Sequence, residues 1–346
     1  MAAALAYFTF GDVGTPPDLI LQKFITSGSS FPLLAVPFFI LAGEIMNYSG
    51  ISSRLMNMAD VLTGHLRGGL AQVNVLLSTL MGGISGSANA DAAMQSKILV
   101  PQMTKRGYST PFSTAITAAS SSIAPVIPPG INLIIYALIA QVSVAKMFIG
   151  GYTPGLLMCV ALMLTVHIIA KKRKYTPGRE KMASGKEILI QFRESIWGLL
   201  LPFGIIFGIR FGIFTPTEAG AMAVLFCIII GVFFYKELKW KHFPIIMKNT
   251  AASVFGQYMS WERIPHLLTK SILAISDSAW IILVVINLLL LILGMFLEGG
   301  ALLIIVAPLL VPVIKTMHID LIHFGLIMIV NIMIGGITPP FGSMMF

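Results

Sequence analysis

Two stretches of the chain interrupt apolar segments with residues that could bind a small cation. The first reads Gly-Gly-Ile-Ser-Gly-Ser-Ala-Asn from Gly82, and the second reads Gly-Gly-Ile-Thr-Pro-Pro-Phe-Gly from Gly335. Hard cations prefer oxygen ligands, and an unwound helix adds free carbonyls to the hydroxyl and amide oxygens of these stretches. The alternative is that the small residues only allow helices to pack closely. The candidate sodium ligands are Gly83, Ser85, Ser87, Asn89, Gly336, Thr338 and Pro339.

A third polar patch precedes a proline-rich break. Three serines are followed, after a short apolar stretch, by Pro125-Val126-Ile127-Pro128-Pro129-Gly130, which no helix crosses unbroken. Helix N-termini beside such breaks present N–H groups and a partial positive charge to an anion. The serines could equally form hydrogen bonds between helices. The candidate substrate-binding residues are Ser120, Ser121, Ser122, Pro128, Pro129 and Gly130.

Several ionisable residues lie at or beside apolar runs, namely Glu44, Asp91, Glu218, Glu298 and Arg210. Ionisable groups at membrane depth are costly, so each is a functional candidate unless it lies at an interface with water. Glu44 and Glu298 could lie at the tips of hairpins. Glu218 follows Thr215-Pro216-Thr217, a pattern typical of a helix N-terminus, so we favour a structural role for it. For Arg210 we favour snorkelling near the end of a span.

The composition is that of a membrane protein. The chain has 346 residues, of which 56% are hydrophobic and 11% are charged, whereas a soluble domain carries roughly 25% charged residues. The formal net charge is +9, but the positive residues cluster in short loops, at 171–186 and 236–248. This clustering favours loops on the cytoplasmic side of a lipid bilayer over a nucleic-acid partner. The sequence contains no HExxH or P-loop motif, so we expect no transition metal, no ATP site and no enzyme activity.

The glycine-cut stretches recur in two halves of the chain. Gly50 and Gly82-Gly83 have counterparts at Gly300 and Gly335-Gly336, at nearly constant separation. Corresponding breaks in two halves are typical of secondary transporters. We therefore predict an all-α polytopic membrane protein made of two structural repeats, which we expect to be inverted.

The predicted parts follow from the apolar runs and their breaks. The first repeat is 1–170, with a re-entrant helical hairpin at 31–63, a broken helix at 70–103 and a Pro-broken segment at 111–130. The second repeat is 187–346, with a hairpin at 278–314 and a broken helix at 321–346, and a basic cytoplasmic loop at 171–186 separates the repeats. Further spans are predicted at 131–149, 152–170, 195–214 and 218–235. Polar residues make 244–261 look irregular and unable to span lipid.

Taken together, the motifs resemble the DctM-like large membrane subunit of tripartite ATP-independent periplasmic (TRAP) transporters. The matching stretches are Phe31–Met46, Gly82–Asp91, Ser120–Gly130, Phe214–Gly220, Leu293–Gly300 and Gly335–Gly342. The resemblance implies an elevator-type carrier of the bacterial inner membrane, driven by sodium ions. It also implies an organic-acid substrate delivered by a periplasmic substrate-binding protein, and a small membrane subunit as partner.

The chain departs from the family pattern at three places. Family members usually begin with a further apolar helix, continue past Phe346, and have a longer apolar helix where 244–261 lies. These departures indicate either that the chain is incomplete or that its numbering omits residues. Two other functions stay open: a stand-alone sodium-coupled anion carrier of a related family, and a membrane enzyme, for which the sequence lacks a cluster of His, Asp or Cys. The sequence does not distinguish dicarboxylates from sialic acids or other acids as substrate.

Overall fold

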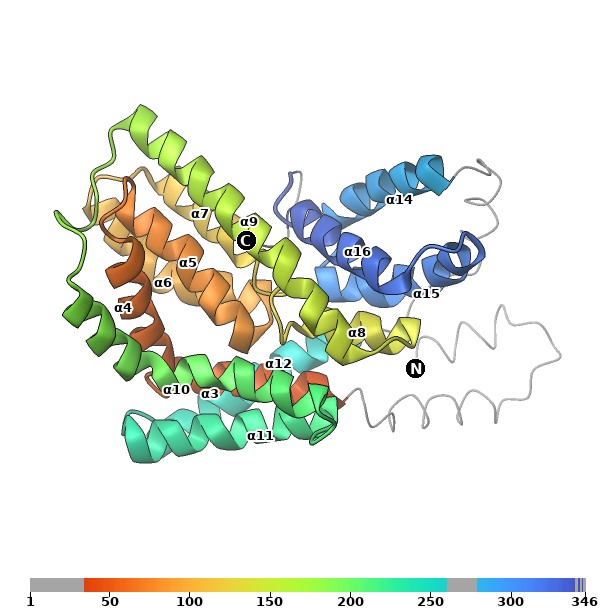
Figure 1. Cartoon of the computed structure of the whole chain (residues 1–346), viewed down its shortest axis with the longest axis horizontal. Helices are drawn as coiled ribbons and strands as arrows, with labels where there is room; N and C mark the ends of the chain where they lie inside the picture. Colours follow the sequence, from red (N-terminus) through yellow and green to blue (C-terminus); the bar gives the residue numbers. More distant parts are fainter. Residues whose placement is uncertain (1–33, 260–278, 340–341, 343, 345–346) are drawn as a thin grey trace.

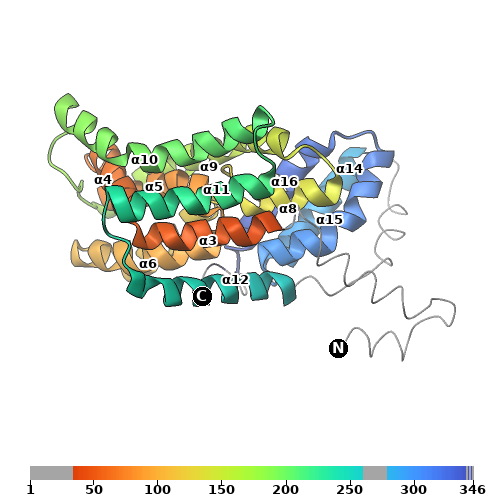
Figure 2. The same ribbon diagram turned by 90° about the horizontal axis from the view of Figure 1, so that it is seen from below.

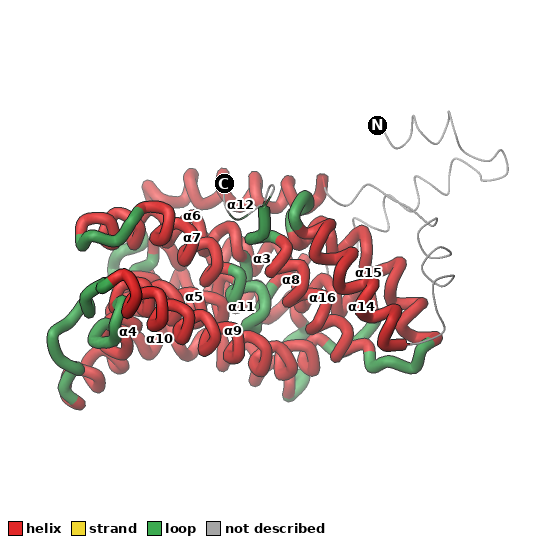
Figure 3. The backbone as a smooth tube through the Cα atoms, turned by 90° about the horizontal axis from the view of Figure 1, so that it is seen from above, coloured by secondary structure: helices red, strands yellow, loops and turns green. Residues whose placement is uncertain are grey.

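The computed structural model describes residues 34–259, 279–339, 342 and 344, and the part it describes contains helices and no strand (Figures 1 and 3). The helices of the first half are α3 (Ala35–Tyr48), α4 (Ile51–Thr63), α5 (Gly69–Ser85), α6 (Ala88–Lys105), α7 (Thr110–Ser121), α8 (Ile131–Ala140) and α9 (Val144–Arg173). Those of the second half are α10 (Gly185–Arg210), α11 (Pro216–Ile229), the π-helix η2 (Ile230–Phe234), the 3-10 helix η3 (Trp240–His242), α12 (Phe243–Met259), α14 (Ala279–Gly294), α15 (Gly299–Thr316) and α16 (Leu321–Gly335).

Several described helices are long and apolar enough to cross a membrane. They are α9, α10, α15 and the continuous segment Pro216–Phe234 formed by α11 and η2. Large apolar side chains such as Leu157, Leu164 and Phe203 lie exposed on α9 and α10, as expected for surfaces that face lipid rather than water. The chain is therefore a membrane-embedded helical protein.

Helix α9 crosses the molecule between two groups of helices (Figure 1). One group contains α3 to α7 with α10 and α11, and the other contains α8 with α14 to α16, an arrangement that Figure 2 shows from a second side. Large buried side chains fill both groups, including Phe39 in the first and Tyr136 and Phe324 in the second. The Tyr136 hydroxyl donates to the Leu321 carbonyl over 2.7 Å, which joins α8 to the start of α16.

Polar N-cap residues set where several of these helices begin. Thr215 and Glu218 form a capping box, in which the Glu218 carboxylate accepts from the Thr215 N–H over 2.7 Å. Asp320 caps α16 by accepting from the His323 N–H over 2.8 Å. Such a cap contributes about 1 kcal/mol to helix stability. The predicted structural role of Glu218 is confirmed.

Helices α5 and α6 form an antiparallel hairpin. The Ser78 hydroxyl of α5 donates to the Asp91 carboxylate over 2.8 Å, and the Gln95 amide donates to Ser78 over 2.7 Å. The two helices can meet in this way because the chain reverses at Gly86 and Ser87, where Gly86 has a left-handed φ of 56°. This corrects the predicted broken helix at 70–103. The interruption is also shorter than the predicted 85–91, because α6 already begins at Ala88.

The two predicted hairpins consist of helix pairs whose limbs diverge after a short turn. Helix α3 packs mainly on α11 and α12, whereas α4 packs on α5 and α10. The limbs of the second pair also pack mainly on other helices, since α14 packs on α16, and α15 packs on α8 and α16. Residues 31–33 of the first predicted hairpin and residue 278 of the second lie outside the described part.

Two predicted spans are replaced by a short helix and a long one. Instead of spans at 131–149 and 152–170, α8 ends at Ala140 and α9 runs unbroken to Arg173. The glycines inside α9 serve close packing rather than a break. A Cβ on Gly155 would lie 2.7 Å from the Ile127 side chain, in the segment that follows α7.

The segment predicted to be irregular at 244–261 is helical over its described part. Helix α12 runs without interruption to Met259 alongside α3 (Figure 2). The Asn249 amide donates to the Glu44 carboxylate over 3.2 Å, so a polar residue of α12 has a partner in α3. Glu44 lies within α3, one turn before its end, and not at the turn itself.

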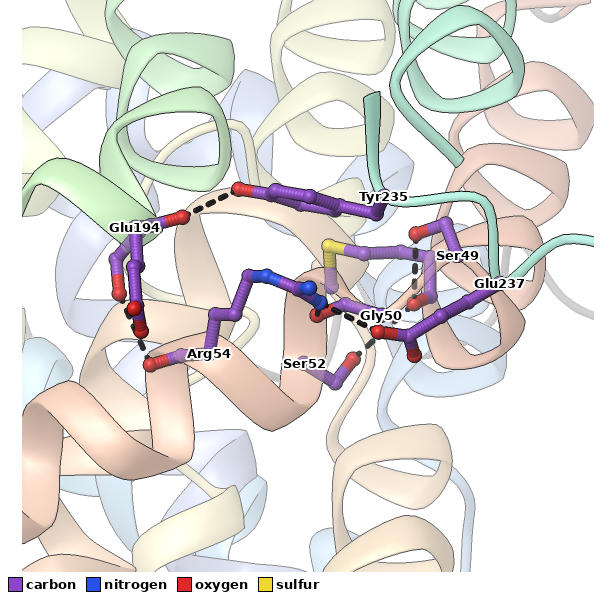
Figure 4. A network of polar contacts seen from close by, with 9 residues as sticks. Ser49, Gly50, Ser52, Arg54, Glu194, Tyr235 and Glu237 are labelled. Carbon is purple, nitrogen blue, oxygen red and sulfur yellow. Dashed lines mark hydrogen bonds and ion pairs between the residues drawn. The ribbon is translucent and has the colours of Figure 1, made fainter. Parts of the chain in front are cut away.

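Two arginines anchor α4 to later parts of the chain. Arg54 pairs with Glu237 at 2.7 Å, and its guanidinium lies 3.7 Å from the centre of the Tyr235 ring (Figure 4). Arg179 donates to Asp60 over 2.8 Å and also pairs with Glu187. Arg179 lies in the predicted basic loop, which in the structure is the shorter connection between α9 and α10.

Candidate functional site

Several separate parts of the chain, including α16 and Met344, meet around a small cavity. Its volume is about 20 Å³, which is room for a single water-sized particle. The tip of the α5–α6 hairpin, the segment around the start of α8 and the start of α15 all contribute to its walls. The lining residues are Gly86, Ser87, Ala88, Asn89, Pro125, Ile131, Asn132, Glu298, Gly299, Met333 and Met344.

Three helices begin at this cavity. The first residues of α6, α8 and α15, which are Ala88, Ile131 and Gly299, all line it. A helix N-terminus carries a partial positive charge and N–H groups without partners inside the helix. The convergence of these N-termini suits an anionic group. The Glu298 carboxylate at the same cavity adds a negative charge, which suits a cation.

Glu298 also fixes the start of α15. Its carboxylate accepts from the Ala301 N–H over 3.2 Å, so it is the N-cap of that helix. The expectation that Glu298 lies at the turn between two helices is confirmed, since α14 ends at Gly294 and α15 begins at Gly299.

The hairpin tip is held directly against the break before α8. The Ile131 N–H donates to the Gly86 carbonyl over 3.3 Å. A Cβ on Gly86 would lie 2.9 Å from both the Ile131 nitrogen and the Pro129 oxygen, so only glycine fits this contact. Gly86 is missing from the predicted ligands, although a glycine between two serines was a visible signal.

Of the candidate sodium ligands at the first break, two line the cavity and one lies away from it. Ser87 and Asn89 line the cavity, and the Ser87 hydroxyl also caps α6 by accepting from the Ala90 N–H over 3.4 Å. Gly83 lies away from the cavity, because a Cβ there would lie 2.8 Å from the Pro202 ring of α10. The side chain of Ser85 lies outside the described part.

The candidate ligands of the second break lie beside the cavity rather than in it. The Gly336 carbonyl accepts from the Met344 N–H over 3.2 Å, and Met344 is a lining residue. Thr338 follows the end of α16, and its hydroxyl donates to the Ile334 carbonyl of that helix over 2.7 Å. Thr338 and Pro339 are not among the lining residues, and Pro339 is exposed.

The three serines before the proline break form hydrogen bonds between helices and within α7 in this conformation. The Ser120 hydroxyl donates to the Asn74 side-chain oxygen over 2.6 Å and so ties α7 to α5. Ser121 and Ser122 donate to carbonyls of α7 itself, at 2.8 and 2.6 Å. None of the three lines the small cavity. The Ser120 contact is of the kind that the alternative explanation, hydrogen bonding between helices, describes.

The proline break shapes the wall opposite the hairpin tip. The Pro129 carbonyl and Gly130 lie against Gly86, and Gly130 is the N-cap residue of α8. Asn132, two residues further on, lines the cavity and is 6% exposed. Asn132 is missing from the predicted site, although an amide directly after a Pro-Pro-Gly break in an apolar run was a signal for it.

A membrane-embedded helical protein with interrupted helices that meet at one cavity has the features of a membrane transport protein. Comparison with known families matches residues 1–346 to "Tripartite ATP-independent periplasmic transporter, DctM component". The chain therefore belongs to the DctM family of TRAP transporter permeases, which is not a class of enzymes.

Curated relatives agree with this family. The chain is 41% identical to the sialic acid TRAP transporter permease protein SiaT of Haemophilus influenzae, over 94% of this chain and 54% of that protein. It is 40% identical to the large permease protein SiaM of Vibrio cholerae, over 99% of this chain and 82% of SiaM. It is 36% identical to the C4-dicarboxylate large permease protein DctM of Pseudomonas aeruginosa, over 95% of this chain and 79% of DctM. The chain thus spans about half the length of SiaT and about four fifths of the other two.

Proposed function

We propose that this chain is the large transport subunit of a sodium-coupled TRAP transporter for an organic acid in a bacterial inner membrane. The observation that carries the proposal is the meeting of three helix N-termini and the Glu298 carboxylate at one cavity. The helix N-termini would attract the carboxylate of a substrate. The Glu298 carboxylate and the nearby oxygens would attract a small cation. The names of the relatives, which include sialic acid and C4-dicarboxylates, support the substrate class.

We propose sodium as the cation, because oxygen-bearing groups surround the cavity. The cavity is lined by Ser87 and Asn89, which carry side-chain oxygens, together with Glu298. Hard cations take such oxygen ligands, and a cavity of about 20 Å³ has room for one small ion without a hydration shell. The Gly336 carbonyl, which contacts the lining residue Met344, and the carbonyls that follow it would supply a second group of ligands.

Membership of the DctM family supports a proposal about partners and motion. We propose that a periplasmic binding protein delivers the acid and that a small membrane subunit braces the scaffold. We further propose that two inverted repeats build the fold and that the α5–α6 hairpin belongs to the part that moves, as in an elevator-type carrier. The alternative, a stand-alone sodium-coupled anion carrier, would need neither partner.

Thermal unfolding of the purified protein tests the joint site. A ligand that binds only the folded state raises stability with its concentration. Sodium should therefore raise the unfolding temperature relative to choline, and an organic acid should raise it further only when sodium is present. Equal unfolding temperatures in sodium and choline would reject the cation site. Transport of free acid by this chain alone, without the two partners, would favour the alternative.

A further inference from the structure

A second polar pocket lies apart from the small cavity, and no residue lines both. Its volume is about 410 Å³. Its walls come from α4, from the first half of α10 and from the segment that follows η2. The lining includes Arg54, Arg193, Glu194, Trp197, Tyr235 and Glu237. We call it the arginine pocket.

Contacts between distant parts of the chain hold the walls of the arginine pocket together. The Ser195 hydroxyl of α10 donates to the Arg54 carbonyl of α4 over 2.9 Å. The Tyr235 hydroxyl donates to the Glu194 carbonyl over 2.6 Å, and the Arg54 guanidinium lies 3.7 Å from the centre of the Tyr235 ring (Figure 4). Because these contacts join all of the walls, the pocket is already formed without a ligand.

The arginine pocket has donors and acceptors that are not used within the described part of the chain. Arg193 has no ion pair or side-chain hydrogen bond there, and Arg54 is bonded only through Nη1, which leaves its Nε and Nη2. One carboxylate oxygen of Glu194 accepts from the Gln191 amide over 3.1 Å, and one of Glu237 accepts from Arg54 over 2.7 Å. The other oxygen of each carboxylate can accept from a ligand.

The arginine pocket lies at the level where a membrane span ends. The apolar segment Pro216–Phe234 stops directly before Tyr235, and the basic residue Lys236 follows. The Trp197 ring lies beside the Phe234 ring, with 4.6 Å between their centres. Aromatic side chains gather where a membrane meets water, and basic loops mark the cytoplasmic side. The pocket is therefore placed among lipid headgroups.

Exposed apolar side chains lie next to the arginine pocket on the membrane side. On α10, Leu200 and Phe203 are exposed and follow Trp197 toward the middle of the span. On η2, Val232 and Phe233 are exposed just before the segment that forms the pocket. Such surfaces contact acyl chains in a membrane. A lipid with its headgroup in the pocket can therefore lay its chains along these residues.

We propose that the arginine pocket binds a phospholipid whose headgroup carries both a phosphate and an ammonium group, as that of phosphatidylethanolamine does. Arg193 and the remaining nitrogens of Arg54 donate to the phosphate, since guanidinium groups form strong charge-assisted hydrogen bonds with phosphate oxygens. Glu194 and Glu237 accept from the ammonium group. An anionic headgroup fits less well, because the two arginines and two glutamates of the lining leave no net charge.

The lipid site does not rest on the proposed function, because its residues line neither the small cavity nor the cavity between α6 and α7. A lipid bound there would contact α4, α10 and the end of the η2 segment at once. It would therefore stabilise the same junction that Arg54 anchors through Glu237 and Tyr235.

Native mass spectrometry of the purified protein tests the site in titrations with phosphatidylethanolamine and, separately, phosphatidylglycerol. We expect the wild type to bind phosphatidylethanolamine about tenfold more tightly, and Arg193→Gln to weaken this binding about tenfold. Arg210→Gln is the matched control, because Arg210 is exposed at the other end of α10 and does not line the pocket. Equal affinities of the wild type for both lipids, or equal losses in the two variants, would overturn the proposal.

Glu194→Gln tests the recognition of the ammonium group. The substitution removes a negative charge but keeps the bond from Tyr235, which uses the backbone carbonyl. Phosphatidylethanolamine should bind more weakly and phosphatidylglycerol more tightly, so that the preference between them falls about tenfold. An unchanged preference would contradict the assignment. Inorganic phosphate at the concentration of the lipid should not displace it, and displacement would assign the pocket to a free anion instead.

Discussion

The Ile131 N–H donates to the Gly86 carbonyl over 3.3 Å, and this bond joins the tip of the α5–α6 hairpin to the start of α8. The two residues are brought together by two different interruptions, a glycine turn and a proline-rich break. Both interruptions end in a helix N-terminus at the same cavity. The geometry of the site therefore depends on how the hairpin tip and the proline-rich break are positioned relative to each other.

Gly86→Ala tests whether the relative position of the hairpin tip and the proline-rich break matters for transport. The substitution puts a Cβ at 2.9 Å from the Ile131 nitrogen and the Pro129 oxygen, on a residue with a φ of 56°. We expect the tip to shift and uptake to fall by about tenfold or more, since small displacements in a positioned site have large effects. Uptake in proteoliposomes measures this loss.

Gly107→Ala is the matched control for backbone strain. Gly107 also has a left-handed φ, of 84°, but a Cβ there meets nothing within 4 Å. Both variants carry the cost of a left-handed non-glycine residue, about 1 kcal/mol. Only Gly86→Ala should lose uptake, so equal losses in the two variants would show that strain alone is responsible.

Glu298→Gln tests the charge at the cavity. Glutamine can still accept from the Ala301 N–H, so α15 keeps its cap while the negative charge is removed. We expect the sodium concentration needed for half-maximal uptake to rise about tenfold, which corresponds to about 1.4 kcal/mol. Asp320→Asn, which changes another acidic N-cap that does not line the cavity, should leave it unchanged. An unchanged sodium requirement in Glu298→Gln would remove this carboxylate from the site.

Asn89→Ala and Ser120→Ala distinguish a cavity residue from a packing residue. Asn89 lines both cavities, so its loss should weaken sodium dependence with little change in stability. Ser120→Ala leaves the buried Asn74 oxygen without its donor at 2.6 Å and should cost about 1–3 kcal/mol of unfolding free energy. Thermal unfolding and the substrate concentration for half-maximal uptake separate the two effects. A weaker apparent affinity for substrate at unchanged stability in Ser120→Ala would place this serine in the substrate site after all.

Arg54→Ala tests the anchor of α4 shown in Figure 4. The pair with Glu237 is partly exposed and is worth about 0–1 kcal/mol by itself. The loss of packing on the Tyr235 ring adds to this, so we expect a total loss of about 1–2 kcal/mol. A double-mutant cycle with Glu237→Ala, followed by thermal unfolding, measures the coupling. Additive effects of the two substitutions would show that the ion pair contributes nothing.

Local signals in the sequence were sufficient for the start of α11. Thr215 and Glu218 have capping-box spacing, and they form that box in the structure. The interruptions near Gly86, Pro128 and Gly336 are also at the predicted places. These features depend on residues within a few positions of one another, which is why the sequence alone could reveal them.

The direction of the chain after each interruption, and the residues that meet at the cavity, depend on contacts between distant parts of the sequence. A glycine-cut helix and a hairpin tip have the same local pattern, and only the bonds of Ser78 to the start of α6 decide that the chain reverses. The sequence predicts separate spans at 131–149 and 152–170, whereas α9 runs through the glycines between them, and the packing of Gly151 and Gly155 on Val126 and Ile127 is a distant contact. Glu298 and Ser87 line one cavity although they lie in different halves of the chain, and no local pattern predicts that meeting.

Uptake of a radiolabelled organic acid into proteoliposomes that contain this chain, its small membrane subunit and its periplasmic binding protein is the most direct test. With an inward sodium gradient the acid should accumulate, and a sodium ionophore that collapses the gradient should abolish accumulation. Undiminished accumulation after the collapse, at an unchanged membrane potential, would contradict sodium coupling at the cavity beside Glu298.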